Sequence, residues 1–281
     1  MKQVGVFGTF SRAGVGRIVT ERAAVIGKRH KARTFDLGGR LPEKLKLDLA
    51  VIVGGDGTIL HAARYLAPLG IPAIGLNIGK FGFLAGCETR DCPDLVEAAL
   101  GGSLKPVVRA MLSCRTKVSG KKAGQLTALN DIVVTSSAPA QMIGIDLAIN
   151  GRAVATFQGD GIIISTATGS TGYNLSCGGP LVSPDRDVIV LTPLAAHTLS
   201  IRPMVISSDD VVTVKVSTRR SDVQVTADGQ VSLEMRDGDS LEARRAPFNF
   251  GLYEGPNWSF YQVVRDKLRW GEEPKYAADR H

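Results

Sequence analysis

The segment at residues 53–58, VGGDGT, combines residue types and spacing that suit chemistry on a phosphate. The continuous apolar run at 49–53 predicts a strand that is buried on both faces. Apolar residues then recur at helical spacing over 59–67, which predicts a helix that ends by Pro68 and Gly70. We therefore expect a strand-to-helix turn at the carboxyl end of a parallel strand, where open α/β sheets bind ligands.

Asp56 is the carboxylate of this turn, among Gly54, Gly55, Gly57 and Thr58. Glycines let a backbone approach a phosphate closely, and the start of a helix adds N–H donors. A carboxylate would repel a phosphate that it only helped to bind, so we interpret Asp56 as a base toward a hydroxyl or as a metal ligand. The turn thus indicates phosphoryl transfer to an alcohol. The alternative is a glycine-rich turn in which Asp56 caps the helix.

Asn130 and Asp131 form a second cluster, because they interrupt an apolar run that predicts a strand over 127–135. Adjacent residues on a strand face opposite ways, so at least one polar side chain would point into a core. Burying both without partners would be costly, and we expect at least one of them to meet a ligand or the rim of the sheet. A bulge or a strand end is the alternative.

A third cluster follows Gly159-Asp160-Gly161, where an expected strand at 162–165 leads into the hydroxyl-rich loop 166–176. Hydroxyl groups donate and accept hydrogen bonds, which suits a base edge and a ribose. Tyr173 can pack on a ring while its hydroxyl bonds elsewhere. A flexible Ser/Gly linker is the alternative, but linkers seldom follow a buried strand with an aromatic residue at their centre, so a binding loop is favoured.

The composition, with 44% hydrophobic and 22% charged residues over 281 positions, is that of a soluble globular protein of one large or two ordinary domains. We expect a cytoplasmic protein, because no apolar run reaches membrane-spanning length and the start has no leader pattern. The net charge of +7 suits anionic ligands, but the scattered basic residues disfavour nucleic-acid binding. The four cysteines and four histidines show no metal-ligand spacing.

The distribution of patterns predicts two domains and a C-terminal segment. Strands expected at 4–7, 32–35, 49–53 and 72–76 alternate with helices expected at 17–29, 59–67 and 91–100, which predicts a parallel sheet in an α/β domain at 1–104. Short β-branched runs predict an all-β domain at 105–256, with strands at 107–117, 127–135, 143–149, 154–157, 162–165, 188–191, 205–206, 211–216, 223–227 and 232–235. Residues 257–281 are expected to be helical or irregular and to end in a loose tail.

Together these clusters resemble the NAD kinase family. The matching motifs are the 54–58 turn, Asn77-x-Gly79-x-x-Gly82-Phe83-Leu84, Asn130-Asp131, the 168–173 loop and Asp228-Gly229-Gln230, and the likeness runs from Val4 to Trp270. Diacylglycerol-type lipid kinases and phosphofructokinases have a related N-terminal domain with the glycine-aspartate turn, but they lack the tyrosine loop. Small departures are Ala167 for a common proline, Gly172 for a common alanine and Asp131 for a common glutamate.

The resemblance implies an α/β N-terminal domain, a β-rich C-terminal domain with an NAD site between them, and a chain end that returns to the first domain. It implies phosphorylation of the adenosine ribose 2′-hydroxyl of NAD to give NADP, with ATP and Mg²⁺ or another divalent cation; some relatives also use polyphosphate. Asp56 would be the base, and Gly54, Gly55, Gly57 and Thr58 would lie by the phosphates. NAD would be bound by Phe83, Leu84, Asn130, Asp131, Asp160, Thr168, Thr171, Gly172, Tyr173, Ser176, Asp228 and Gln230.

The resemblance leaves the metal ligands open, with Asn130 and Asp131 holding either ribose hydroxyls or the metal. It also implies a homo-oligomer, a dimer or a tetramer, without nucleic acid or membrane as partner. Two alternative functions are a lipid kinase of the diacylglycerol type and a non-catalytic NADP(H)-binding regulator. The sequence leaves open whether the donor is ATP or polyphosphate, whether NADH is accepted, and whether NADPH regulates the protein.

Overall fold

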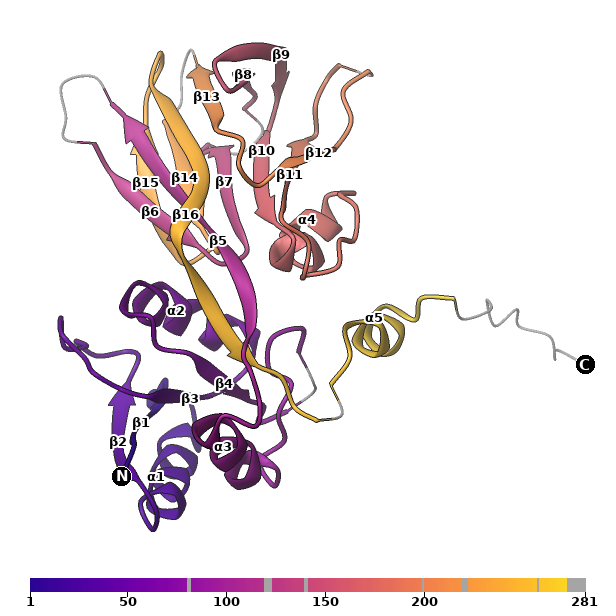
Figure 1. The fold of residues 1–281 in the computed structure, drawn as a ribbon. Coiled ribbons are helices and arrows are strands. Elements are labelled where there is room, and N and C mark those ends of the chain that lie inside the picture. The colour runs from indigo at the N-terminus through magenta and orange to yellow at the C-terminus, as the bar shows by residue number, and fades with distance from the viewer. Residues whose placement is uncertain are drawn as a thin grey trace, which may run out of the picture.

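The computed structural model describes residues 1–79, 82–118, 123–138, 141–198, 200–218, 222–256 and 258–271. Figure 1 shows two halves that are joined by two long strands. The first half contains parallel strands in the order β2-β1-β3-β4, of which β3 and β4 are buried along their whole length. These strands are β1 (Gln3–Gly8), β2 (Lys31–Asp36), β3 (Leu49–Val53) and β4 (Ala73–Leu76).

Helices cover both faces of this parallel sheet. α1 (Val15–Ile26) and α3 (Cys92–Gly101) pack on one face, and α2 (Asp56–Leu66) packs on the other. The short turn η1 (Ala67–Leu69) follows α2, and Gly70, with φ of 67°, adopts the left-handed conformation that glycine tolerates. The predicted α/β half, with a strand-to-helix turn at 53–58, is confirmed.

The second half consists of two β-sheets that face each other across an apolar core. One is the antiparallel six-stranded sheet β12-β11-β10-β7-β14-β15, and the other contains β5, β6, β8, β9, β13 and β16. The strands are β5 (Val107–Lys117), β6 (Gln125–Ala128), β7 (Asp131–Ser136), β8 (Ile143–Ile149), β9 (Arg152–Gly159), β10 (Gly161–Thr166), β11 (Val188–Leu194), β12 (Met204–Ser207), β13 (Val212–Ser217), β14 (Val223–Ala227), β15 (Val231–Met235) and β16 (Ser240–Tyr253). The predicted β-rich half is confirmed.

The longest strand, β16, was not predicted from the sequence. Its carboxyl end pairs in parallel with β4 through Leu252 and Tyr253, while most of its length pairs with β5. A single ten-stranded sheet therefore runs from the first half into the second. Charged residues, a proline at 247 and a register shift between Arg245 and Asn249 break the alternating pattern that identifies a strand.

The single strand expected at 127–135 is also wrong, because the chain turns at Leu129 and Asn130. β6 ends at Ala128 and pairs with β5, whereas β7 begins at Asp131 and pairs with β10 and β14 in the other sheet. The polar pair thus lies where the chain crosses between sheets, in accord with the strand-end alternative. The loop after β10 also contains regular structure, the 3-10 turn η2 (Thr168–Thr171) and the short helix α4 (Tyr173–Ser176).

The C-terminal segment forms helix α5 (Phe260–Leu268), which begins after Ser259. The ring of Phe260 lies 6.2 Å from that of Phe83, centroid to centroid, and Lys267 Nζ lies 5.4 Å from the Phe83 ring. Helix α5 therefore contacts the loop that contains Phe83. The expected loose tail falls on residues 272–281, which lie outside the described part of the chain.

The described helices are short compared with the thickness of a bilayer. α1, at 12 residues, is the longest of the described helices, far below the length needed to cross a membrane, and none of them qualifies as a spanning segment.

Candidate active site

The glycine turn lies between β3 and α2, at the carboxyl edge of the parallel sheet. A side chain on Gly54 would overlap Thr58, so this position requires glycine. Gly55 and Gly57 are exposed, and a methyl group at Gly55 would meet nothing within 4 Å. The turn therefore presents open backbone at the start of a helix, whereas the side chain of Thr58 is buried beneath it.

Asp56, the first residue of α2, is held by the loop that follows β4. Its Oδ2 accepts a hydrogen bond from the N–H of Phe83 at 2.9 Å, and its Oδ1 accepts from Leu84 at 3.0 Å and Ala85 at 3.1 Å. Oδ2 takes a single amide bond and keeps lone-pair capacity for a hydroxyl. The glycine-rich loop that follows β4 thus orients the carboxylate at the sheet edge.

Gly82 allows this close approach. A methyl group added at Gly82 would overlap the Asp56 carboxylate, whereas one added at Gly79 in the same loop would meet nothing within 4 Å. We expect Gly82→Ala to push the loop off Asp56 and to lower kcat by ~10²-fold, the effect of about 1 Å of misplacement. Gly79→Ala is the matched control and should stay within a few-fold of the parent. Equal kcat values for the two variants would contradict this role of Gly82.

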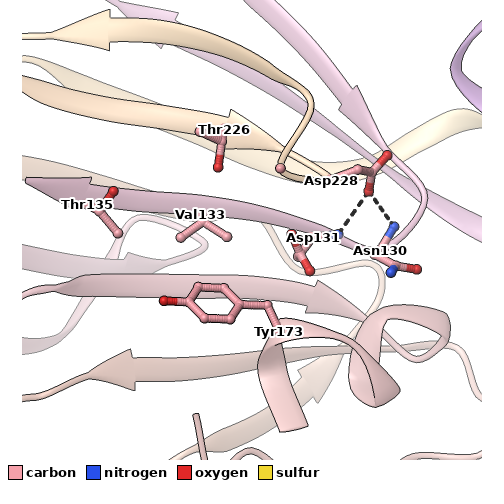
Figure 2. A pocket seen from close by; sticks show the side chains of 8 residues that line it. Asn130, Asp131, Val133, Thr135, Tyr173, Thr226 and Asp228 are labelled. Atoms are coloured by element: carbon pink, nitrogen blue, oxygen red, sulfur yellow. Dashed lines mark hydrogen bonds between the residues drawn. The ribbon is translucent and has the colours of Figure 1, made fainter. Parts of the chain in front are cut away.

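A cavity of about 320 Å³ lies on the outer face of the six-stranded sheet. Alternate residues of β7, Asp131, Val133 and Thr135, lie along one side of it, and Tyr173 stands opposite them (Figure 2). The remaining lining residues are Asn130, Thr226, Asp228 and Gly229. Val133 and the ring of Tyr173 are the apolar part of this lining, and the polar groups beside them complete a site that fits a planar ring joined to a sugar.

Two polar groups at the end of this cavity are suited to binding a hydroxyl. Asn130 Oδ1 is buried and has no hydrogen-bond partner among the described residues. Asp131 is 4% exposed, and burial, followed by the charge of Asp228, raises the pKa of Asp131 to about 7. Buried acceptors without partners are costly unless a ligand supplies a donor, so this end of the cavity is suited to a diol.

The raised pKa of Asp131 predicts how stability depends on pH. The folded chain holds a proton on Asp131 between pH 3.8, the ordinary value, and about 7, whereas the unfolded chain has lost it. Protonated Asp131 therefore makes its whole contribution to the free energy of unfolding below pH 3.8. This contribution falls as pH rises from 3.8 to about 7, by up to about 1.4 kcal/mol per pH unit. Urea unfolding between pH 5 and 7.5 should show a shallower decline for Asp131→Asn than for the parent; parallel curves would contradict the assignment.

None of the other predicted contact residues is among those that line this cavity. Gly172 touches its polar end, because a methyl group there would lie 3.1 Å from Asn130 Nδ2. Asp160 lies beside the Thr135 end, where its carbonyl accepts the Ser136 N–H at 3.3 Å. Thr168 is buried, Thr171 is half-buried with its hydroxyl on the Thr168 carbonyl, Ser176 is exposed, and Leu84 packs in the core of the first half.

Asp228 and Gln230 connect the two halves of the molecule. The Asp228 carboxylate accepts the N–H groups of Leu129, Asn130 and Asp131 at 3.2, 2.7 and 3.3 Å. It also pairs with Arg64 of α2 at 2.9 Å. Burial raises the pKa of Asp228, and the amides and Arg64 oppose that rise.

The sequence analysis missed Arg64, Val133, Thr135 and Thr226. The period-2 alternation that begins at Asp131 was a usable signal for Val133 and Thr135, because they share its face of β7. Gln230 Nε2 donates to the Gly57 carbonyl at 2.8 Å, and Gly229 lines the cavity. The 228–230 turn therefore contacts both the glycine turn at 54–58 and the cavity that Tyr173 lines.

Family models match most of the chain. The ATP-NAD kinase N-terminal domain matches residues 9–103, and the ATP-NAD kinase C-terminal domain matches residues 129–255. The NAD kinase of Geobacter sulfurreducens is 39% identical over 248 residues, covering 86% of this chain and 87% of the relative. That of Geobacter metallireducens is 35% identical over 282 residues, covering 97% and 100%.

Solved structures show the same fold. Yeast NADH kinase complexed with NADH superposes with a TM-score of 0.87 at 20% identity, over 97% of this chain and 89% of that one. An NAD kinase from Archaeoglobus fulgidus in complex with ATP gives a TM-score of 0.76 at 28% identity, over 95% and 98%. On this evidence the chain belongs to the NAD kinase family, enzymes that phosphorylate NAD.

Proposed function

We propose that Asp56 is the general base that takes the proton from the adenosine ribose 2′-hydroxyl of NAD as the phosphoryl group of ATP is transferred to it. The observation that carries this proposal is the fixed carboxylate at the start of α2, beside open glycine backbone. Phosphoryl transfer depends mainly on positioning and on neutralising charge, and both are properties of such a turn. Gly55 and Gly57 would hold the phosphates through backbone N–H groups, because the Gly54 N–H already donates to the Leu76 carbonyl at 2.9 Å.

NAD would lie along β7, with one of its rings between Val133 and Tyr173. Its ribose hydroxyls would then lie on Asn130 and Asp131. The unpartnered Asn130 Oδ1 supports this placement, because a ribose hydroxyl would supply the missing donor. Gly172, next to Asn130, and Asp160, whose carbonyl accepts the Ser136 N–H, lie close enough to the cavity to contact the remainder of the dinucleotide. Thr168, Thr171 and Ser176 lie on the adjoining η2 and α4. Phe83 and Leu84 contribute their N–H groups to Asp56 in this scheme.

The residues by the turn also fit a divalent cation. Mg²⁺ usually binds one or two carboxylates together with substrate phosphates, and Asp56 is the carboxylate that the turn provides. Within the described ranges no group of three or more histidine, cysteine, aspartate or glutamate side chains could hold a metal ion by itself. Such a cation would neutralise charge on the transferred phosphoryl group.

The test is a product assay on the purified chain with NAD and Mg²⁺, and with either ATP or polyphosphate as donor. We expect NADP to form with ATP, and the polyphosphate arm decides whether both donors serve. Parallel reactions with NADH and with diacylglycerol address acceptor choice. Product from diacylglycerol without NADP would support the lipid kinase, and NAD binding without transfer from any donor would support the non-catalytic NADP(H)-binding regulator.

The proposal also covers the location, the oligomeric state and the domain roles of the enzyme. We place it in the cytoplasm, as a homo-oligomer, dimer or tetramer, on the strength of family membership. We also propose that residues 1–104 carry the phosphate side, 105–256 the NAD side, and 257–281 a segment that braces the Phe83 loop. Light scattering on a size-exclusion column would measure the oligomeric state; a monomer would contradict that part.

A further inference from the structure

Arg64 lies on α2 eight residues after Asp56, or about 12 Å along the helix axis. Figure 1 shows α2 on the side of the first half that faces the β-rich half. The Arg64 side chain is only 13% exposed, and its partner Asp228 is fully buried. A buried arginine on the helix that carries the base has a defined position and few alternative partners.

The two nitrogen atoms at the end of the Arg64 guanidinium serve two partners of the same turn. Nη1 donates to Asp228 Oδ2 at 2.9 Å, and Nη2 donates to Gln230 Oε1 at 2.6 Å. Gln230 in turn donates from Nε2 to the carbonyl oxygen of Gly57 at 2.8 Å. Because arginine presents a planar fork, it fixes the orientation of both partners together.

Gln230 and Asp228 each contact a different part of the proposed active site. Gln230 holds the backbone of Gly57, next to Asp56, while Asp228 accepts the backbone N–H groups of Asn130 and Asp131. Asp228 and Gly229 both have positive φ, 52° and 63°, which form the tight turn that points these groups toward α2. Arg64 therefore links the glycine turn of one half to the ribose-binding end of the cavity in the other.

We propose that Arg64 is a positioning residue for phosphoryl transfer, which acts through Gln230 and Asp228 and without contact to NAD or ATP. This rests on the proposed function, in which Asp56 and the Asn130–Asp131 pair act on the same ribose. The reacting atoms must approach to roughly 3–3.5 Å, so the relative placement of the two halves controls turnover. Two strands join the halves, and the Arg64 network adds a second point of attachment.

Two conservative variants test this inference. Arg64→Lys keeps the charge but cannot hold both partners in fixed orientation, and Gln230→Glu keeps the acceptor for Arg64 but loses the donor to Gly57. We expect each to lower kcat by ~10-fold or more while the NAD dissociation constant and the KM for ATP stay within ~3-fold. The double variant should lose little more than the more affected single variant, because both act in one network.

Matched controls are Arg17→Lys on α1 and Gln125→Glu on β6, which make the same chemical changes at exposed sites. Both should keep the kcat of the parent. An unchanged kcat in Arg64→Lys and Gln230→Glu would overturn the inference, as would a raised KM for ATP or NAD with unchanged kcat, which would indicate a ligand contact. Gln230 is exposed, so its variant tests the proposal even if Arg64→Lys fails to fold. If the parent enzyme forms no NADP, the proposed function itself is contradicted.

Discussion

Asp56→Asn is expected to lower turnover by ~10²–10⁴-fold, the range for loss of a general base, while NAD still binds. The amide keeps one oxygen to accept the loop N–H groups but places an NH₂ where Phe83 or Leu84 donates. The variant is therefore expected to fold with a loosened loop and without a proton acceptor. The measurement is the single-turnover rate of NADP formation at saturating ATP, together with NAD binding at equilibrium.

Asp36 provides the control for that experiment. Asp36 is the last residue of β2 and so lies at the same carboxyl edge of the parallel sheet. Its Oδ1 accepts backbone N–H groups from Phe10 at 3.0 Å and Gly38 at 2.9 Å. Asp36→Asn makes the same chemical change in a carboxylate that also organises a loop, outside the site, and should leave turnover within a few-fold of the parent. If Asp56→Asn binds NAD and keeps near-parental turnover, Asp56 is not the general base.

Asp228→Ala is expected to be the most destabilising single change, at ~3–5 kcal/mol, the cost of removing one partner of a buried ion pair. The substitution leaves Arg64 unpaired and orphans the N–H groups of Leu129, Asn130 and Asp131. It also removes the charge that contributes to the raised pKa of Asp131, so that pKa should fall. Urea unfolding gives the stability change, and NMR titration of Asp131 gives the pKa.

Asp237 is the matched control, because it begins another Asp-Gly turn in the β-rich half. It is exposed, and its Oδ1 accepts one N–H, from Thr218, at 2.8 Å. Asp237→Ala should cost about 1 kcal/mol or less, the net worth of one exposed hydrogen bond. Similar losses for the two alanine variants would show that the network around Asp228 stabilises the fold no more than an ordinary surface turn does.

The sequence predicted best what local patterns encode. The 53–58 turn follows a strand of five apolar residues and precedes a helix with an apolar stripe, so its place at the sheet edge could be predicted. The Asp228-Gly229 turn could also be identified, because both positions favour positive φ. Signals of this kind depend only on neighbours in the chain.

Features that depend on distant partners escaped prediction. Arg64 reads as an ordinary helix residue, because its partner Asp228 lies 164 positions away. β16 lacks clean alternation, since its register shifts between Arg245 and Asn249 as it passes from the β-rich half to β4 within one sheet. The expected strand over 127–135 looked continuous because each part is apolar, and only the pairing of β6 and β7 with different sheets divides it.

The β5–β16 pair has a mechanical consequence. A two-stranded ribbon that is hydrogen-bonded along its length resists stretching and in-plane bending, but it yields to torsion about its own axis. The carboxyl end of this ribbon is anchored in the parallel sheet by the pairing of Leu252 and Tyr253 with β4. The twist of the ribbon therefore sets the orientation of one half relative to the other, and with it the approach of the two sides of the site.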